Sequence, residues 1–159
     1  MPVTMEQVRK ALDPDEPDYS KAATLGPGAL PHLQTLVLGD DEMLASKAAY
    51  LAGLIRDEKS LRVIETATSS KSDLVRLAAA GTARNLAEPH ASRVLLLLIS
   101  DADSGVRMAV LESIGKRPTK ELVEQVKRLS QNDPDREVRN LAAHVLLGLK
   151  RRVRRPVKN

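Results

Sequence analysis

The sequence predicts an all-α protein, a right-handed α-solenoid of about four stacked helical hairpins behind a degenerate N-terminal cap. Three observations predict it: a core without bulky aromatics, a repeat of about thirty residues, and an apolar stripe at helical spacing. The chain of 159 residues has no Phe, Trp or Cys and two Tyr. Its core must be built from Leu, Ala, Val and Ile, and Leu and Ala are strong helix formers.

The repeat is clearest in two segments, "SDADSGVRMAVLESIGK" and "NDPDREVRNLAAHVLLGLK", which share an Asp-rich turn, a Val-Arg pair and an apolar run that reaches a Gly. Aligning them places Val106 opposite Val138, and the same register reaches back to Val75 and Leu44. The spacings between these four anchors are 31, 31 and 32 residues. A fixed period in this range is typical of a stacked repeat array.

Each anchor begins an apolar stripe. Counting 0, +4, +8 and +11 from the anchors gives an apolar residue at fifteen of sixteen positions, with Arg117 as the exception. This spacing is that of one face of a helix. A shorter apolar stretch precedes each stripe, namely "ALPHLQTLVL", "SLRVIETA", "ASRVLLLLI" and "ELVEQVKRL". The unit is therefore a helical hairpin, which can bury its apolar faces only against neighbouring hairpins.

The start of the chain is expected to cap the stack. Thr4 and Gln7 have the spacing of a capping box, and Pro14 and Pro17 then separate this short helix from a second one. Array ends need an atypical polar cap. We expect one domain over residues 1–150, with a cap at 1–27 and repeats at about 28–56, 57–87, 88–117 and 118–150, followed by a basic tail at 151–159.

Asp and Arg recur together around the turn inside each hairpin. The pairs separated by six residues are Asp101 with Arg107 and Asp133 with Arg139, while Ser70 precedes Arg76 and the first hairpin has Ala45 in place of the Arg. With this spacing, the period and the stripe, the chain resembles the HEAT-repeat family over roughly residues 28–150. It is most similar to the short bacterial-type repeats also seen in phycobilisome lyase subunits. The resemblance implies an architecture and leaves the function open, because such repeats serve many unrelated partners.

The repeated Arg residues have two interpretations. Arg76, Arg107 and Arg139 could form a ladder that grips phosphates or acidic side chains of a ligand. Alternatively, each Arg ties down an Asp-rich turn or helix end in its own or the next hairpin. The regular spacing favours the second, structural interpretation for these Arg residues and for Asp101 and Asp133.

The resemblance implies that the second helix of each hairpin lines a concave face. Positions +2, +6 and +9 from the anchors lie off the stripe and should point outwards there, including Ser46 and Gly53 in the first hairpin. Tyr, Met and Arg are favoured in protein interfaces. The alternative is that these side chains pack against neighbouring helices. The predicted partner-binding residues are Tyr50, Leu77, Arg84, Met108, Glu112, Asn140 and His144.

The segment "KRRVRRPVKN" at the end of the chain carries six bases and no acid, so it contributes +6 to a net charge of +4. Its bases could complement a helix dipole, attract nucleic acid or an anionic membrane surface, or bind an acidic protein. Because the rest of the chain is close to −2 and has few aromatics, a nucleic-acid role would depend on this tail. The residues of this predicted anion-binding tail are Lys150, Arg151, Arg152, Arg154 and Arg155.

No catalytic or metal-binding residues are predicted. His32, His90 and His144 lie in different hairpins without ligand spacing, and there is no Gly-rich phosphate loop. We therefore expect a non-catalytic scaffold without a cofactor that binds another protein through the concave face. The alternatives are a nucleic-acid-binding protein that uses the tail and a bilin lyase-type HEAT subunit, although few aromatics are present to enclose a tetrapyrrole. The lack of Cys, of a signal-like start and of a membrane-length apolar run predicts a cytoplasmic protein.

Overall fold

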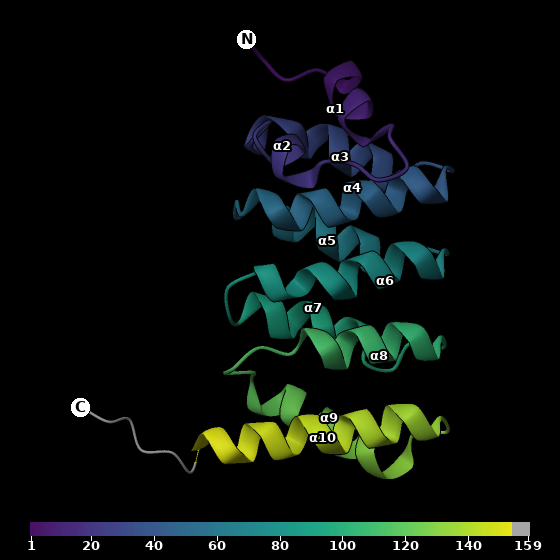
Figure 1. Cartoon of the computed structure of the whole chain (residues 1–159), viewed down its shortest axis with the longest axis vertical. Coiled ribbons are helices and arrows are strands. Elements are labelled where there is room, and N and C mark those ends of the chain that lie inside the picture. The colour runs from purple at the N-terminus through teal and green to yellow at the C-terminus, as the bar shows by residue number, and fades with distance from the viewer. Residues whose placement is uncertain (154–159) are drawn as a thin grey trace, which may run out of the picture.

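The computed structural model describes residues 1–153, and all of their regular elements are helical, which confirms the prediction of an all-α solenoid (Figure 1). The α-helices are α1 (Met5–Leu12), α2 (Tyr19–Ala23), α3 (Leu30–Val37), α4 (Glu42–Ile55), α5 (Ser60–Thr68), α6 (Asp73–Thr82), α7 (His90–Leu98), α8 (Ser104–Ser113), α9 (Lys120–Asn132) and α10 (Arg136–Val153). Two short 3-10 helices, η1 (Pro27–Ala29) and η2 (Ala83–Asn85), precede α3 and follow α6.

The helices follow one another down a single stack, with α1 at one end and α9 and α10 at the other (Figure 1). Helices α4, α6, α8 and α10 form one layer and α3, α5, α7 and α9 the other. Each helix of a layer packs on its partner in the hairpin and on the equivalent helix of the next hairpin. The core is therefore continuous along the stack and consists almost entirely of Leu, Ala, Val and Ile.

The apolar stripe faces this core along most of its length. Val75, Val106 and Val138 are at most 1% exposed. The pattern fails at the end of the third stripe, because α8 ends at Ser113 and the following residue, Ile114, is extended. Arg117 consequently lies exposed in the linker to α9 and is not part of a helix face.

Close approach of α4 and α6 explains one departure from the predicted pattern. Gly53, expected on the outer surface, is buried in α4 against α6. A Cβ atom placed on Gly53 would lie 1.7 Å from Oγ1 of Thr82. The stack therefore needs a residue without a side chain at this position, which a pattern of polar and apolar residues cannot distinguish from an exposed Gly.

The N-terminal helices close one end of the stack. Thr4 and Gln7 form the expected capping box at the start of α1, which buries Val8 and Leu12. Nζ of Lys47 in α4 donates to the carbonyl oxygens of Leu12 and Pro14, at 3.2 and 2.8 Å. This lysine fastens the irregular segment after α1 to the first complete hairpin.

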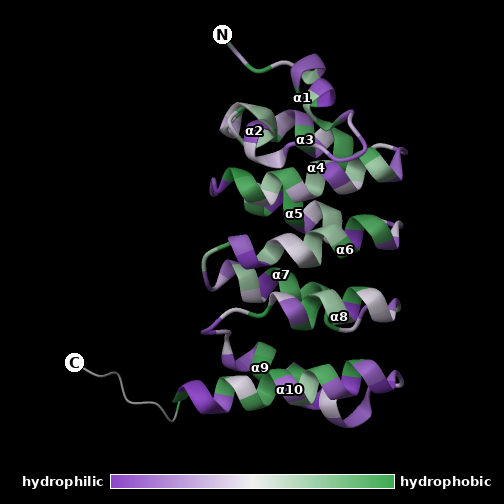
Figure 2. Ribbon diagram, in the orientation of Figure 1, coloured by the Kyte–Doolittle hydropathy of each residue, from purple (hydrophilic) through white to green (hydrophobic). Residues whose placement is uncertain are grey.

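The C-terminal hairpin is more polar than the complete hairpins before it. Of α9, Leu122 and Val126 alone are buried, and α10 is hydrophobic in its middle and hydrophilic towards both ends (Figure 2). None of the helices in residues 1–153 combines the length and the apolarity that crossing a bilayer requires.

Candidate functional site

An open groove of about 410 Å³ lies across α4, α6 and α8. We call it the central groove. Its position follows from the stack, because the three helices lie in one layer and present the same register to solvent. It is lined by Tyr19, Ser46, Lys47, Tyr50, Leu74, Leu77, Ala78, Gly81, Gly105, Met108, Ala109 and Glu112.

Apolar side chains are exposed in the central groove. Tyr50 of α4 is 37% exposed and Leu77 of α6 is 38% exposed, while Met108 of α8 is half-buried beside them. Such residues bury apolar area when a partner covers them. Lys47 and Glu112 add one charge of each sign, so the groove combines an apolar surface with weak overall charge.

Two tyrosines meet at the α4 side of the groove. The rings of Tyr19 and Tyr50 lie edge to face, with centroids 4.7 Å apart and planes at 70°. Burial raises the pKa of Tyr19, and the neighbouring Tyr50 raises it further. The Tyr19 hydroxyl is therefore neutral and able to donate a hydrogen bond at physiological pH.

The structure places four of the seven predicted partner-binding residues in this groove: Tyr50, Leu77, Met108 and Glu112. Arg84 lies elsewhere, because α6 gives way to η2 before it and its Nε donates to the Gly81 carbonyl oxygen at 3.2 Å. Asn140 and His144 are exposed on α10, outside the groove lining.

Several groove residues are absent from the sequence-based prediction. Tyr19 comes from the cap helix α2, and Lys47 and Leu74 occupy positions that the repeat register did not assign to the outer face. Only Tyr19 had a usable signal, since it is one of two aromatic residues in the chain. Ser46 lines the groove but is only 7% exposed, and its Oγ is already satisfied because it donates to the Met43 carbonyl oxygen at 2.8 Å.

The Arg residues of the repeat join successive hairpins. Arg76 donates from Nε and Nη2 to the carboxylate of Asp101 at 2.7 and 3.1 Å. Arg107 does the same to Asp133 at 2.8 and 2.9 Å. In both cases Nη1 donates to two carbonyl oxygens of the turn inside the Arg residue's own hairpin. Each guanidinium thus fixes two turns at once.

Burial and pairing act in opposite directions on these carboxyl groups. Burial alone raises the pKa of Asp133, but the hydrogen bonds from Arg107 and from the backbone N–H of Asp135 outweigh it and hold the pKa below 3.8. The pKa of Asp101 is lowered for the same reasons, with Arg76 as its hydrogen-bond partner. The hydrogen bond to Asp133 in turn raises the pKa of Arg107. Both pairs are therefore fully ionised at neutral pH.

Within residues 1–153, the Arg–Asp pair between successive hairpins is complete only in the middle of the stack. Arg139 donates from Nη1 to the carbonyl oxygens of Asp133 and Pro134, and in the part of the chain that the structure describes it forms no ion pair. Between the first two hairpins the pair is missing on both sides, because Ala45 replaces the Arg and Ser70 the Asp. Arg76 and Arg107 are thus engaged within the protein.

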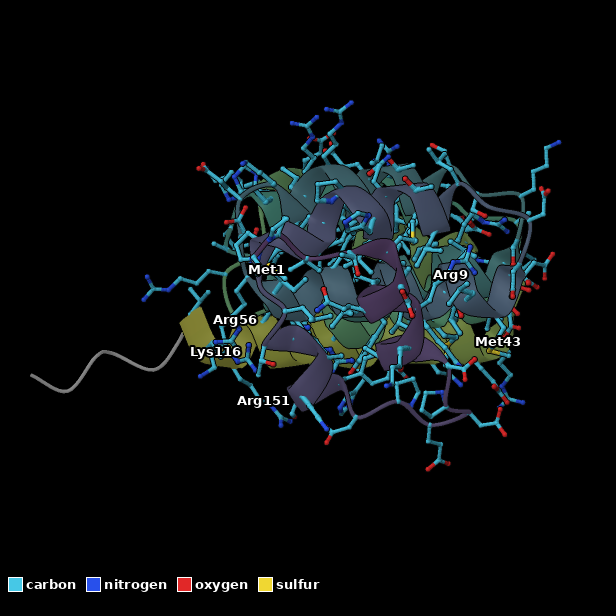
Figure 3. The ribbon with its side chains drawn as sticks, turned by 90° about the horizontal axis from the view of Figure 1, so that it is seen from above. Met1, Arg9, Met43, Arg56, Lys116 and Arg151 are labelled. Atoms are coloured by element: carbon cyan, nitrogen blue, oxygen red, sulfur yellow. The ribbon has the colours of Figure 1, made fainter. Side chains whose placement is uncertain are left out.

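The tail predicted to bind anions is only partly described. Lys150, Arg151 and Arg152 form the last turn of α10 and are exposed. Arg154 and Arg155 lie outside the described residues. Seen down the stack, Arg151 lies on the same side as Lys116 and Arg56, opposite Arg9 and Met43 (Figure 3).

The histidines are not gathered into one centre. His32 places Nε2 at 2.8 Å from the Val3 carbonyl oxygen, whereas His90 and His144 are exposed on α7 and α10. Within residues 1–153, no group of three or more His, Asp or Glu side chains is arranged to hold a metal ion.

Comparison with known proteins identifies the fold. A family model for HEAT repeats matches residues 62–147, and no curated protein matches the sequence. A solved structure, the complex of CpcE and CpcF of phycocyanin lyase from Nostoc sp. PCC7120, contains a similar chain with a TM-score of 0.68 and 21% sequence identity. The match covers 89% of this chain and 96% of that one, and at this identity it concerns the fold. Because the HEAT model spans more than half of its residues, this chain belongs to the HEAT-repeat family.

Proposed function

We propose that this protein is a non-catalytic scaffold that binds a segment of another protein in the central groove. The observation that carries the proposal is that exposed Tyr50 and Leu77 and half-buried Met108, from three successive helices of one layer, gather in one groove. Tyr and Met are enriched at protein interfaces, and large apolar side chains that gather in a groove differ from the scattered exposed residues of an ordinary surface.

The layout of the groove limits what it can bind. Packed helices lie about 8–10 Å apart, so a segment that crosses from α4 over α6 to α8 spans roughly 20 Å, or about six residues of extended chain. Met108 adapts its shape to a partner more easily than a branched side chain, which suits segments of varied sequence. Glu112 in the lining would orient the segment through its charge, whereas Nζ of Lys47 is already held by the carbonyl oxygens of Leu12 and Pro14.

A double substitution tests the proposal. Tyr50→Ser with Met108→Ser should lower the recovery of specific partners in a pull-down from lysate by at least tenfold, the effect of about 1.4 kcal/mol of lost binding energy. Leu97→Ser is the matched control, because Leu97 is 57% exposed on α7 in the other layer. Equal yields of the same partners with the double variant would remove the central groove from consideration.

The likeness to a chain of the phycocyanin lyase complex supports a bilin lyase-type subunit as a second candidate. In this candidate, Tyr19 and Tyr50 would supply the aromatic contact to a tetrapyrrole in the central groove. Mixing the protein with a free bilin should then shift the visible absorbance of the pigment, and Tyr50→Ser should abolish the shift. An unchanged spectrum at saturating protein would exclude a bilin site in this chain alone.

The exposed bases Lys150, Arg151 and Arg152 support nucleic-acid binding as a third candidate. Retention on heparin or duplex DNA across a salt series, with and without residues 150–159, separates it from the others. A steep salt dependence that is lost on truncation is the expected result for phosphate contacts. Passage of the full-length chain through both columns at low salt would eliminate this candidate.

A further inference from the structure

A second groove, of about 600 Å³, lies between α9, the end of α10 and the linker that joins α8 to α9. We call it the C-terminal groove. It is separate from the central groove, with which it shares no lining residue. Its lining residues are Lys116, Arg117, Pro118, Val123, Lys127, Leu146, Leu149, Lys150, Arg152 and Val153.

The groove exists because α8 is too short to cover α10. Measured from the anchors Val106 and Val138, α8 ends after seven residues at Ser113, whereas α10 continues for fifteen to Val153. The eight additional residues correspond to about two helical turns, or roughly 12 Å. Over this length α10 has no counterpart in the preceding hairpin, although α4, α6 and α8 are stacked on one another.

The last turns of α10 nevertheless keep an apolar face. Leu146, Leu149 and Val153 point into the C-terminal groove together with Val123 of α9. A helix end that is covered by α9 alone would normally carry polar residues on its remaining sides. These side chains line space that α8 leaves uncovered, because the helix ends at Ser113 and the linker residues Lys116 to Pro118 border the groove instead.

The rim of this groove is strongly positive. Lys116 and Arg117 come from the linker and Lys150 and Arg152 from α10, and none of the four forms an ion pair within residues 1–153. Lys127 is the exception, because it pairs with Glu124 at 2.9 Å. No acidic residue lines the groove, so an anionic partner meets no repulsion from it.

We propose that the C-terminal groove binds an acidic amphipathic helix of a partner protein, which takes the place of the missing turns of α8. The partner helix would place apolar residues at a spacing of three and four on Leu146, Leu149 and Val153. Its Asp and Glu side chains would meet Lys116, Arg117 and Arg152. This binding mode is that of a helix docked in a groove, with charge complementarity fixing its orientation.

Charge and polarity argue against the other occupants. Residues 154–159 include three bases and no acid, so the rim would repel them. A nucleic acid would satisfy the rim but leave Leu149 and Val153 without apolar contacts, and no aromatic residue in the lining offers a stacking surface for bases. A helix that is apolar on one face and acidic on the flanks satisfies both parts of the groove.

The probe is a fluorescent synthetic peptide of about four helical turns (~14 residues), with Leu at helical spacing and Glu elsewhere. Its binding to the full-length protein is followed by fluorescence anisotropy. The same peptide with Lys in place of Glu, and one with Ser in place of Leu, should each bind at least tenfold more weakly. Equal affinity for the Lys peptide would overturn the proposal.

Charge reversal of the rim localises the binding. Arg117→Glu with Arg152→Glu should lower the affinity for the Glu/Leu peptide by at least tenfold, because the new carboxylates repel its Glu side chains. Both side chains are exposed, so their replacement leaves the core intact. The matched control, Arg9→Glu with Lys10→Glu, makes the same change of net charge on α1 at the other end of the stack. Unchanged affinity in the rim variant, or an equal loss in the control, would contradict the assignment.

Two further measurements distinguish the other occupants. Duplex DNA that binds more tightly than the Glu/Leu peptide, with an affinity that Val153→Ser leaves unchanged, would overturn the proposal in favour of nucleic acid. Concentration-dependent dimers in sedimentation velocity that the rim variant abolishes would assign the groove to a second copy of this chain instead. The variant Tyr50→Ser with Met108→Ser should bind the peptide like the unmodified protein, which keeps this test independent of the central groove.

Discussion

The guanidinium of Arg107, in the α7–α8 hairpin, holds the carboxylate of Asp133, in the turn of the α9–α10 hairpin, through two hydrogen bonds of 2.8 and 2.9 Å. The side chains of this pair are 9% and 2% exposed. The same guanidinium binds the carbonyl oxygens of Asp101 and Ala102. Since Asp101 in turn accepts from Arg76, the pairs form a chain of contacts through three successive turns.

Arg107→Ala should destabilise the protein more than the equivalent change of Arg139. Removing Arg107 leaves the Asp133 carboxylate buried without its counter-charge, at a cost of about 3 kcal/mol and a fall of roughly 6–12 °C in Tm. Arg139→Ala removes hydrogen bonds to two carbonyl oxygens and a weaker charge interaction with Asp133 that involves no side-chain hydrogen bond, a loss of about 1 kcal/mol. Thermal melts of both variants check the order, and an Arg107→Ala melt that matches the wild type would refute it.

The stability of the stack should fall at acid pH because of Asp133. Pairing with Arg107 holds the pKa of this carboxyl below its ordinary value of 3.8, so near that pH the unfolded chain binds more protons than the native one. The free energy of unfolding then rises with pH in this range, and the contribution of the pair is complete above about pH 5 and lost as the pH falls through the native pKa.

Asp133→Asn should therefore be less stable than the wild type at pH 7, with a difference that narrows between about pH 5 and pH 2. Urea denaturation at a series of pH values measures this difference. Arg107→Gln combined with Asp133→Asn is the control. It also lacks the carboxyl group of Asp133, so its free energy of unfolding should change with pH at low pH as that of the single variant does. A difference that stays constant down to pH 2 would show that the pair does not control the acid transition.

The sequence showed which Arg and Asp residues take part in these contacts, but not which Asp each Arg binds. Asp101 and Arg107 share one hairpin and are six residues apart, which suggests a pair within the hairpin, whereas each Arg binds the Asp of the next one. One signal was available, because Ala45 and Ser70 show the Arg and the following Asp missing together. A contact between hairpins explains that joint loss, and a contact within a hairpin does not.

The sequence predicts the lining residues of the central groove wherever the repeat register alone decides which side chains face it. Tyr50, Leu77 and Met108 follow from the register of the stripe and from helices of regular length. Arg84 departs from the prediction because α6 changes to a 3-10 helix before it. The C-terminal groove depends on the early end of α8 at Ser113, and the apolar Ile114 gave no sign of that end.

Gly53→Ala should destabilise the protein although Ala is the better helix former. Its Cβ would lie 1.7 Å from Oγ1 of Thr82, so α4 and α6 must separate, at a cost of about 1–3 kcal/mol. Gly148→Ala is the matched control, because Gly148 is exposed on α10 with no atom within 4 Å of the new Cβ. It should gain about 0.5–1 kcal/mol from helix propensity. Urea denaturation compares the two, and equal changes would mean that the close helix approach is not required.

Asn substitutions should separate the two roles that Asp residues have in these turns. Asp103 caps α8, since its side chain accepts from the N–H of Val106 at 3.0 Å, and Asn is an equally good cap. Asp103→Asn should therefore change stability by only a few tenths of a kcal/mol, while Asp103→Ala costs about 1 kcal/mol. Asp101 instead neutralises Arg76, so Asp101→Asn should cost about 2 kcal/mol despite its matching shape. Denaturation curves of the three variants test this order. If Asp101→Asn were as mild as Asp103→Asn, hydrogen bonding rather than charge would hold successive hairpins together.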